Sequence, residues 1–305
     1  MKDLSIIIIS YNTKEITKKC IDTIIQSLNY DTSIGAEIII VDNGSVDGSV
    51  EMLQQIKNLK LKIKNYNVKF KTILNKQNLG YAKANNLAAK NAEGKYLLFL
   101  NSDIEVINDA IPQLYNFFIR KENAFNFLGG KLLNKDLSPQ PSCGPFYSLP
   151  VIFGALFLRG DYWGLTRWSP NKIKQVDWIS GACILTKKEF FNKVGGFDEN
   201  IFMYMDEVDM LYRAKKLGFK VGFYPEAKFI HHGCASSKGR TQPILQVYRG
   251  FLYFYKKHYS RLEATILKFM LKLKAIISIL VGKIVKNQYL IKTYEEAIQI
   301  IKYFR

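Results

Sequence analysis

The feature that most constrains the fold is an apolar run that stops abruptly at small polar residues and recurs in the first third of the chain. One such run, YLLFLNSD at 96–103, has five large apolar residues before its polar end. Others are LSIIII at 4–9, EIIIVDNGS at 37–45 and VKFKTILN at 68–75. Continuous apolar strands of this kind are buried on both faces, as in a parallel sheet. Helical patterns separate them, at about 14–28, 47–57 and 80–92. This alternation predicts an α/β fold with right-handed crossovers.

Polar residues cluster where these predicted strands end. Because the carboxyl ends of parallel strands lie along one edge of a sheet, and open α/β folds bind ligands there, the clusters predict one ligand site. The residues concerned are Ser10, Tyr11 and Asn12; Asp42, Asn43, Gly44 and Ser45; Asn78 and Gly80; and Asn101, Ser102 and Asp103.

Two aspartates in these clusters each have a structural and a functional interpretation. Asp42 precedes Asn43-Gly44, a turn-forming pair, but its carboxylate could also accept the imide N–H of uracil or thymine. Asp103 could cap the following segment, or it could give one oxygen to Mg²⁺ or Mn²⁺ beside diphosphate oxygens and water.

The stretch MYMDEVDMLYRAKKLGF places Asp206, Glu207 and Asp209 at the start of a predicted helix. The helix dipole accounts for one acid there, and an i,i+4 pair with Arg213 accounts for Asp209. Three acids in four residues exceed what capping needs, so one carboxylate is a candidate general base. His231 and His232 follow an apolar segment and are either ordinary histidines or contacts for a metal or phosphate.

Composition limits the class of partner. The formal net charge of +18 over 305 residues indicates an anionic partner: nucleic acid, anionic lipid or a phosphate-bearing small molecule. No nucleic-acid motif is present and the lysines are spread along the chain, so no nucleic acid is expected. Four cysteines without metal-ligand spacing are expected to be reduced thiols. Neither a signal peptide nor a transmembrane segment is expected.

Two regions allow more than one interpretation. LGGKLLNKDLSPQPSCGPF, at 128–146, is rich in Gly, Pro and Ser and is interpreted as loops, and the apolar stretch 146–168 as core, acceptor lid or membrane-facing loop. The chain from 244 to 303 is predicted to be helical. Its lysine-dotted apolar pattern fits either a helical appendage packed on the domain or on a dimer partner, or an interfacial helix on anionic lipid.

Six motifs in order resemble glycosyltransferase family 2, the inverting nucleotide-sugar enzymes of the GT-A fold. They are SIIIISYN, IIIVDNGSVDGS, NKQNLGYAKANN, LFLNSD, the block from WISGAC to LGFKV, and YPEAKFIHHG. The last two are most similar to the rhamnosyltransferase-like branch that builds bacterial surface polysaccharides. The resemblance implies a Rossmann-like, mostly parallel sheet flanked by helices, with a C-terminal helical appendage.

The resemblance also implies roles for residues. Those that line the nucleotide and donor pocket would be Ser10, Tyr11, Asn12, Asp42, Asn43, Gly44, Asn78, Gly80, Asn101 and Ser102. Those at the sugar and acceptor pocket would be Trp178, Ser180, Gly181 and Ala182. Asp103 and His231 would contact a divalent metal, Mg²⁺ or Mn²⁺. Either Glu207, which has the family's position, or Asp206, which has its chemical type, would be the base.

The implied activity is inverting transfer of a sugar, rhamnose in this branch, from a dTDP- or UDP-sugar to a hydroxyl of a glycan or lipid-linked acceptor. Residues 1–243 would form the GT-A domain, with a nucleotide-binding half to about 105 and an acceptor half from 106. Residues 244–305 would form the extension, and the protein would be cytoplasmic, at the inner face of the cell membrane if the tail binds lipid. Asn101 in place of the first aspartate of the family's DxD motif, and the inverted Asp206-Glu207 order, keep open a catalytically inactive nucleotide-sugar-binding or scaffold protein.

Overall fold

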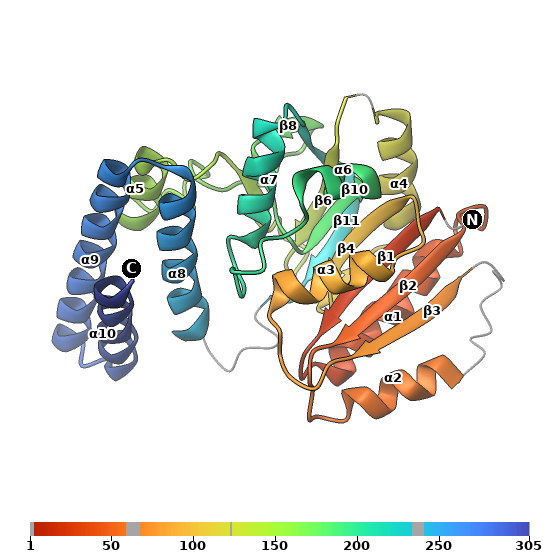
Figure 1. Cartoon of the computed structure of the whole chain (residues 1–305), viewed down its shortest axis with the longest axis horizontal. Coiled ribbons are helices and arrows are strands. Elements are labelled where there is room, and N and C mark those ends of the chain that lie inside the picture. Colours follow the sequence, from red (N-terminus) through yellow and green to blue (C-terminus); the bar gives the residue numbers. More distant parts are fainter. Residues whose placement is uncertain (1–2, 59–67, 123, 234–240, 305) are drawn as a thin grey trace.

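The structure is a computed structural model that describes residues 3–58, 68–122, 124–233 and 241–304. A nine-stranded sheet forms its centre (Figure 1). Four parallel strands form one half, in the order β3 (Lys69–Leu74), β2 (Ala36–Asp42), β1 (Leu4–Ser10) and β4 (Tyr96–Asn101). The other half continues through β10 (Cys183–Lys187), β6 (Phe127–Leu133), β11 (Val221–His231) and β5 (Ile104–Val106), and β8 (Lys174–Val176) pairs with β11. The predicted mixed α/β architecture is therefore confirmed.

The register of the parallel strands aligns the polar clusters. Ser10 pairs with Asp42, and Ile9 pairs with Asn101, so the last residues of β1, β2 and β4 lie side by side. The strands are parallel because a crossover helix follows β1, β2 and β3. These helices are α1 (Lys14–Leu28), α2 (Ser49–Asn58) and α3 (Tyr81–Asn91).

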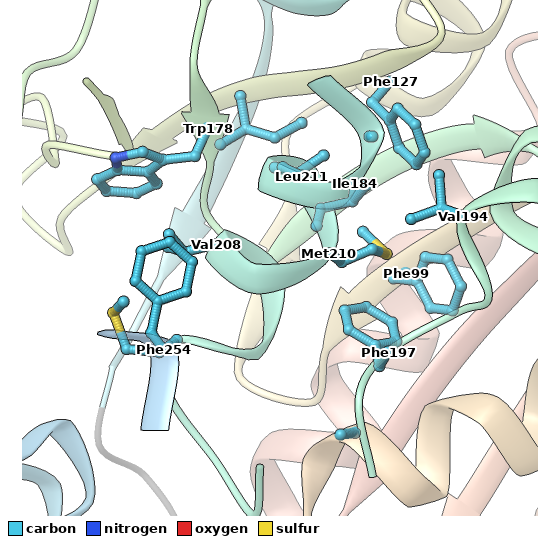
Figure 2. Packing of buried hydrophobic residues seen from close by; sticks show 14 of the residues in the cluster. Phe99, Phe127, Trp178, Ile184, Val194, Phe197, Val208, Met210, Leu211 and Phe254 are labelled. Atoms are coloured by element: carbon cyan, nitrogen blue, oxygen red, sulfur yellow. The ribbon is translucent and has the colours of Figure 1, made fainter. Parts of the chain in front are cut away.

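Helices cover both faces of the sheet. Side chains of α1, α2 and α4 (Ala110–Arg120) pack in one buried cluster, and those of α3, α6 (Lys188–Val194) and α7 (Asp206–Lys216) pack in the other. Figure 2 shows part of the second cluster, in which Phe99 of β4, Val208 of α7 and Phe254 of α8 (Thr241–His258) belong to one core. Helix α8 is therefore continuous with the core of the sheet domain.

The interpretation of residues 128–146 as loops is wrong for their first part. Residues 127–133, FLGGKLL, form the fully buried strand β6 inside the sheet. The two glycines, which usually indicate a loop, caused the wrong prediction, because here they allow close packing within the sheet. A Cβ on Gly129 would lie 2.9 Å from Cβ of Ile179, and one on Gly130 would clash with the ring of Phe229.

The C-terminal region is helical, as predicted. It consists of α8 (Thr241–His258), α9 (Arg261–Ile284) and α10 (Gln288–Tyr303), which lie together at one end of the molecule in Figure 1. Helix α5 (Leu149–Phe157), from the apolar stretch 146–168, packs against α9. None of the helices in the described ranges is both long and apolar enough to span a membrane.

A buried ion cluster fixes α8 to α7. Asp209 is fully buried and accepts hydrogen bonds from Arg213 Nε at 2.8 Å, Lys257 Nζ at 2.8 Å and His258 Nε2 at 2.7 Å. Burial alone would raise the pKa of Asp209, but these hydrogen bonds and the charge of Arg213 hold it below its ordinary value. The predicted pair of Asp209 and Arg213 is confirmed, and Asp209 is structural.

Candidate functional site

Asp42 ends β2 with one carboxylate oxygen engaged and the other unpaired. Its Oδ2 accepts the backbone N–H groups of Gly44 at 3.1 Å and Ser45 at 2.9 Å, so the turn interpretation is correct for this oxygen. Oδ1 is buried and has no hydrogen-bond partner among the residues that the structure describes. A buried acceptor without a donor is costly unless a ligand supplies one. The two interpretations of Asp42 are therefore compatible, one for each oxygen.

Asn43 holds the loop that follows β3. Its Nδ2 donates to Asn78 Oδ1 at 2.9 Å, and its Oδ1 accepts from Asn75 Nδ2 at 3.0 Å and from Leu79 N at 3.1 Å. Asn78 Oδ1 also accepts from Gly80 N at 2.9 Å. The polar groups of Asn43 and Asn78 are largely used inside the protein, so these residues shape the site through the backbone that they hold.

Two glycines in this edge allow close backbone approach. Gly44 has φ +83°, and a Cβ there would lie 2.9 Å from the Gln77 backbone. Gly80, also at φ +83°, lies against Phe202, whose carbonyl oxygen would be 2.6 Å from a Cβ. The next residue, Tyr81, donates its backbone N–H to that same carbonyl at 2.7 Å. The β3–α3 loop is thus joined to the segment that precedes α7.

The residues after β1 are mainly structural. Ser10 is buried and shares hydrogen bonds with Thr13 and Thr17. Asn12 Oδ1 accepts a hydrogen bond from the Val46 backbone N–H, and the Asn12 backbone N–H donates to the Ser45 hydroxyl. Tyr11 is half-buried, and among the described residues no other aromatic ring packs on it. Their contribution is to hold the β1 and β2 loops together, so the edge is a preformed wall.

Asp103 lies beyond β4 and faces His231 from β11. The carboxylate Oδ1 is 3.4 Å from His231 Nε2, and Asn101 Nδ2 is 3.3 Å from the same ring nitrogen. Burial would raise the pKa of Asp103, but His231 more than offsets this and holds it below its ordinary value. His232 points elsewhere, with its Nε2 2.5 Å from Glu105 Oε1.

The tautomer of His231 follows from the amide of Gln140. Gln140 Nε2 donates to Asn134 Oδ1 at 3.0 Å and to the His231 carbonyl at 3.2 Å, which turns Gln140 Oε1 toward the ring. His231 Nδ1 therefore carries the proton that it donates to Oε1 at 2.6 Å. Nε2 is left facing the Asp103 carboxylate and the Asn101 amide, and in a neutral ring it would offer a lone pair to a cation.

This pair suits a shared cation. One carboxylate oxygen and one imidazole nitrogen converge, and the Gln140 amide fixes the ring through its other nitrogen, which is a common arrangement at metal sites. Across the described portions of the chain, however, no group of three or more His, Cys, Asp and Glu side chains is placed to hold a metal. The protein offers at most a partial ligand set, which fits an ion completed by oxygens of a ligand.

Two acids stand at the start of α7 on an unusual turn. Tyr204 and Met205 have φ values of +63° and +65°, and consecutive left-handed residues without glycine are strained. This turn buries Asp206, which is 2% exposed and whose Oδ2 has no partner, while Glu207 remains partly exposed. Of the two carboxylates, Glu207 is the one that a ligand can reach.

Both acids hold a proton more readily than ordinary carboxyl groups. Burial and the neighbouring charge of Glu207 raise the pKa of Asp206 well above its ordinary value. Burial also raises the pKa of Glu207, although backbone hydrogen bonds, among them one from Gly181, and the charge of Arg167 oppose this. A raised pKa is a property of many carboxylates that act as general bases.

Tyr81 connects the acids to the sheet edge. Its hydroxyl donates to the Gly181 carbonyl at 2.7 Å, and a Cβ on Gly181 would lie 3.6 Å from Glu207 Cβ. Burial raises the pKa of Tyr81 well above its ordinary value, and the charges of Asp206, Glu207 and Asp103 add to the shift. The Asn101 N–H donates to the Ala182 carbonyl at 3.2 Å, so the turn beside Glu207 also meets the end of β4, which leads to Asp103.

The predicted sugar and acceptor residues divide into two groups. Gly181 lies beside Glu207, as described above, and Ser180 Oγ accepts from Ala182 N in the same turn. Trp178 is buried, donates its indole N–H to the Pro145 carbonyl at 2.8 Å and stacks on Tyr147. It therefore supports the site from within the core. Arg167 lies over the Trp178 ring at 5.6 Å, and its Nε has no hydrogen-bond partner.

Three residues of the site were missed by the sequence analysis. Tyr81 was within a quoted motif, and its position directly after Gly80 at a helix start is the signal that could have identified it. Gln140 and Arg167 lie in irregular segments where no periodicity or spacing points to them. Only the fold brings them to His231 and Glu207.

The raised pKa values give a stability prediction for Asp206→Asn. Below the ordinary pKa of these carboxyls, both the folded and the unfolded state bind their protons and the free energy of unfolding is highest. It falls as the pH rises through the raised pKa values of the folded state. Asparagine keeps the shape but removes the charge, so we expect the variant to gain on the order of 1 kcal/mol, with the larger gain at about pH 8 than at about pH 5. Thermal melts at both pH values measure this. Asp22→Asn, on the exposed side of α1, is the control, and an equal or negative shift at both pH values would contradict the prediction.

Comparisons with known proteins identify related sequences. The family model described as "Glycosyl transferase family 2" matches residues 5–136. An N-acetylglucosaminyl-diphospho-decaprenol L-rhamnosyltransferase of Mycobacterium tuberculosis is 28% identical over 72% of this chain and 74% of its own length. The low-salt glycan biosynthesis hexosyltransferase Agl10 of Haloferax volcanii is 26% identical over 82% of this chain and 74% of its own.

Solved structures share the fold. The mannosyltransferase PcManGT from Pyrobaculum calidifontis, in complex with GDP-Man and Mn²⁺, matches 99% of this chain and 75% of its own with a TM-score of 0.58 and 11% identity. Residues 1–349 of TarS from S. aureus match 100% of this chain and 93% of their own with a TM-score of 0.55 and 14% identity. At these identities the likeness establishes the GT-A fold alone.

Proposed function

We propose that this glycosyltransferase, whose residues 5–136 match the family 2 model, moves a sugar from a dTDP- or UDP-linked donor to a hydroxyl of a lipid-linked glycan. The sugar proposed is rhamnose, because two similar proteins, from M. tuberculosis and Escherichia coli, are named rhamnosyltransferases. Such a reaction belongs to cell-surface polysaccharide synthesis at the cytoplasmic face of the membrane.

One observation carries this proposal: the turn at Gly181 and Ala182 accepts the Tyr81 hydroxyl on the side of Glu207 and the Asn101 N–H, two residues before Asp103, on the other. Inversion by a single displacement needs a base on one side of the anomeric carbon and charge stabilisation on the other. Glu207 is the reachable carboxylate, so it takes the proton of the acceptor hydroxyl as the oxygen attacks.

Asp103 and His231 are proposed to hold a divalent cation, Mn²⁺ or Mg²⁺, at the donor diphosphate. In a neutral ring, His231 Nε2 would join the carboxylate Oδ1 as the two protein ligands of such an ion. When bound, the ion supplies positive charge that stabilises the departing nucleoside diphosphate. Gln140 positions the ring, and Asn101 contacts the same nitrogen in place of a second carboxylate.

The experiment that tests the function measures thermal stabilisation by a panel of nucleotides and nucleotide sugars, with and without Mn²⁺ or Mg²⁺. A nucleotide at 100 times its dissociation constant adds about 2.7 kcal/mol. We expect UDP or dTDP to stabilise the protein and GDP not to. The best nucleotide sugar is then tested for turnover with a lipid-linked acceptor. No shift with any nucleotide would overturn the proposal.

Asp42→Asn should change the base preference without breaking the turn. The asparagine oxygen can still accept from Gly44 and Ser45, which leaves the NH₂ group at the unpaired position of Oδ1. Two donors then face each other when uracil or thymine binds, so we expect about 10–100-fold weaker UDP or dTDP binding. Calorimetric titration of wild type and variant measures this. Unchanged affinity would show that Asp42 does not contact the base.

A further inference from the structure

Helix α9 carries a continuous exposed apolar stripe that the folded chain leaves unused. Its members share one face, since at 3.6 residues per turn they fall within an arc of roughly 100°. They are Leu262, Ile266, Phe269, Leu273, Ile276, Ile277, Leu280 and Ile284. This set, here called the α9 stripe, runs about 33 Å along the helix at 1.5 Å per residue.

The stripe is not needed to hold α9 in place. Leu267, Leu271 and Ala275, on the other side of the helix, are fully buried, and α9 packs against α5, α8 and α10. The helix is capped at its start by a capping box between Ser260 and Glu263. The exposed apolar surface is therefore additional to a face that already anchors the helix, and contiguous patches of this kind mark interaction surfaces.

Charge identifies the partner. Residues 261–286 contain Arg261 and five lysines, Lys268, Lys272, Lys274, Lys283 and Lys286, but only one acid, Glu263. That acid is engaged in the cap. At 100° per residue, Lys272 and Lys283 flank the stripe on one side and Lys274 on the other. An apolar stripe bordered by cations complements a surface that is apolar below and anionic above.

The neighbouring helix α10 provides an internal contrast. Its outward surface carries Lys292, Glu295, Glu296 and Gln299, a mixed polar set typical of a face in water. This set differs from the apolar and basic α9 stripe. Exposed apolar residues also follow α5, which packs on α9: Leu158, Tyr162, Trp163 and Leu165.

We propose that the α9 stripe binds the surface of an anionic lipid bilayer. The helix lies along the interface, with the stripe at the boundary of the acyl chains and the flanking lysines at the headgroup phosphates. A second copy of the chain is a poorer occupant, since two such faces would bring like charges together and neither offers acids in exchange. The inference rests on the proposed function only for its purpose, which is to bring the site to a lipid-linked acceptor.

The test is co-sedimentation of the full chain with vesicles of phosphatidylcholine alone, or with about one quarter phosphatidylglycerol, at low and high salt. We expect binding to the anionic vesicles only. The double variant Phe269→Gln/Leu273→Gln should bind about tenfold or more weakly, and Lys272→Ala/Lys283→Ala about 30-fold more weakly. Ile119→Gln, on α4, is the matched control, because Ile119 and Leu273 are both 39% exposed.

Each outcome has a distinct meaning. Loss of binding in both double variants, with wild-type binding in Ile119→Gln, supports the proposal. No binding to anionic vesicles by the wild type overturns it, as does a dimer in light scattering that Phe269→Gln/Leu273→Gln dissociates. Nucleotide-dependent thermal stabilisation is measured on every variant. If it is intact while vesicle binding fails, the lipid surface is wrong and the proposed transferase function stands.

Discussion

Glu207→Gln is expected to lower kcat by about 10²–10⁴-fold, the range that a general base typically contributes. Glutamine fills the same space beside Gly181 but cannot take the acceptor proton. Donor binding should be unchanged, because the residue acts on the acceptor hydroxyl and not on the nucleotide. Steady-state kinetics and nucleotide-dependent thermal stabilisation together measure this separation.

Asp206→Asn distinguishes the two acids. If Glu207 is the base, Asp206→Asn should lower kcat by a smaller factor than Glu207→Gln does, because its carboxyl is buried and acts through its neighbour. Glu296→Gln, on the exposed side of α10, is the control. It also replaces a carboxylate by an amide, but outside the site, and should have wild-type kinetics. A larger loss in Asp206→Asn than in Glu207→Gln would reverse the assignment.

Asp103→Asn is expected to abolish the part of UDP or dTDP stabilisation that depends on Mn²⁺. The substitution keeps the size of the side chain and removes the negative charge that faces His231 Nε2. Residues that only hydrogen-bond to a metal ligand change metal affinity by roughly 10–100-fold, so loss of a direct ligand should weaken it by at least as much. Turnover should fall in parallel. Thermal melts with nucleotide, across a series of Mn²⁺ concentrations, measure the change.

Two variants make the Asp103 result specific. Gln140→Leu removes the acceptor that fixes His231, so its metal response should weaken less than that of Asp103→Asn but more than that of the surface control Asp22→Asn. If nucleotide stabilises wild type and Asp103→Asn equally, with or without Mn²⁺, the metal proposal fails. The diphosphate charge would then have to be met by the protein's own cations.

The carboxyl edge of the sheet was predictable because it depends on local pattern. Buried strands have continuous apolar sequences, and their ends are marked by turn formers, so Asp42 and Asp103 could be located from the chain alone. The same reasoning failed for residues 127–133. There the glycines that signal loops are needed because Ile179 and Phe229 approach the strand closely.

The roles inside the site needed the structure. Asn43 and Asn78 carry the same polar groups as a ligand-binding residue would, and only their hydrogen bonds show that they hold a loop. Adjacent acids look equivalent in sequence, but the left-handed turn at Tyr204 and Met205 buries one and leaves the other reachable.

The sequence by itself determined the fold class, the helical C-terminal region and the strand ends that carry the site, because hydrophobic periodicity and turn chemistry are local properties. Tertiary structure alone decided which atoms meet: Gln140 with His231, Tyr81 with Gly181, and α5 with α9. These contacts join residues distant along the chain. Their geometry follows from strand order and packing, which no short stretch of sequence specifies.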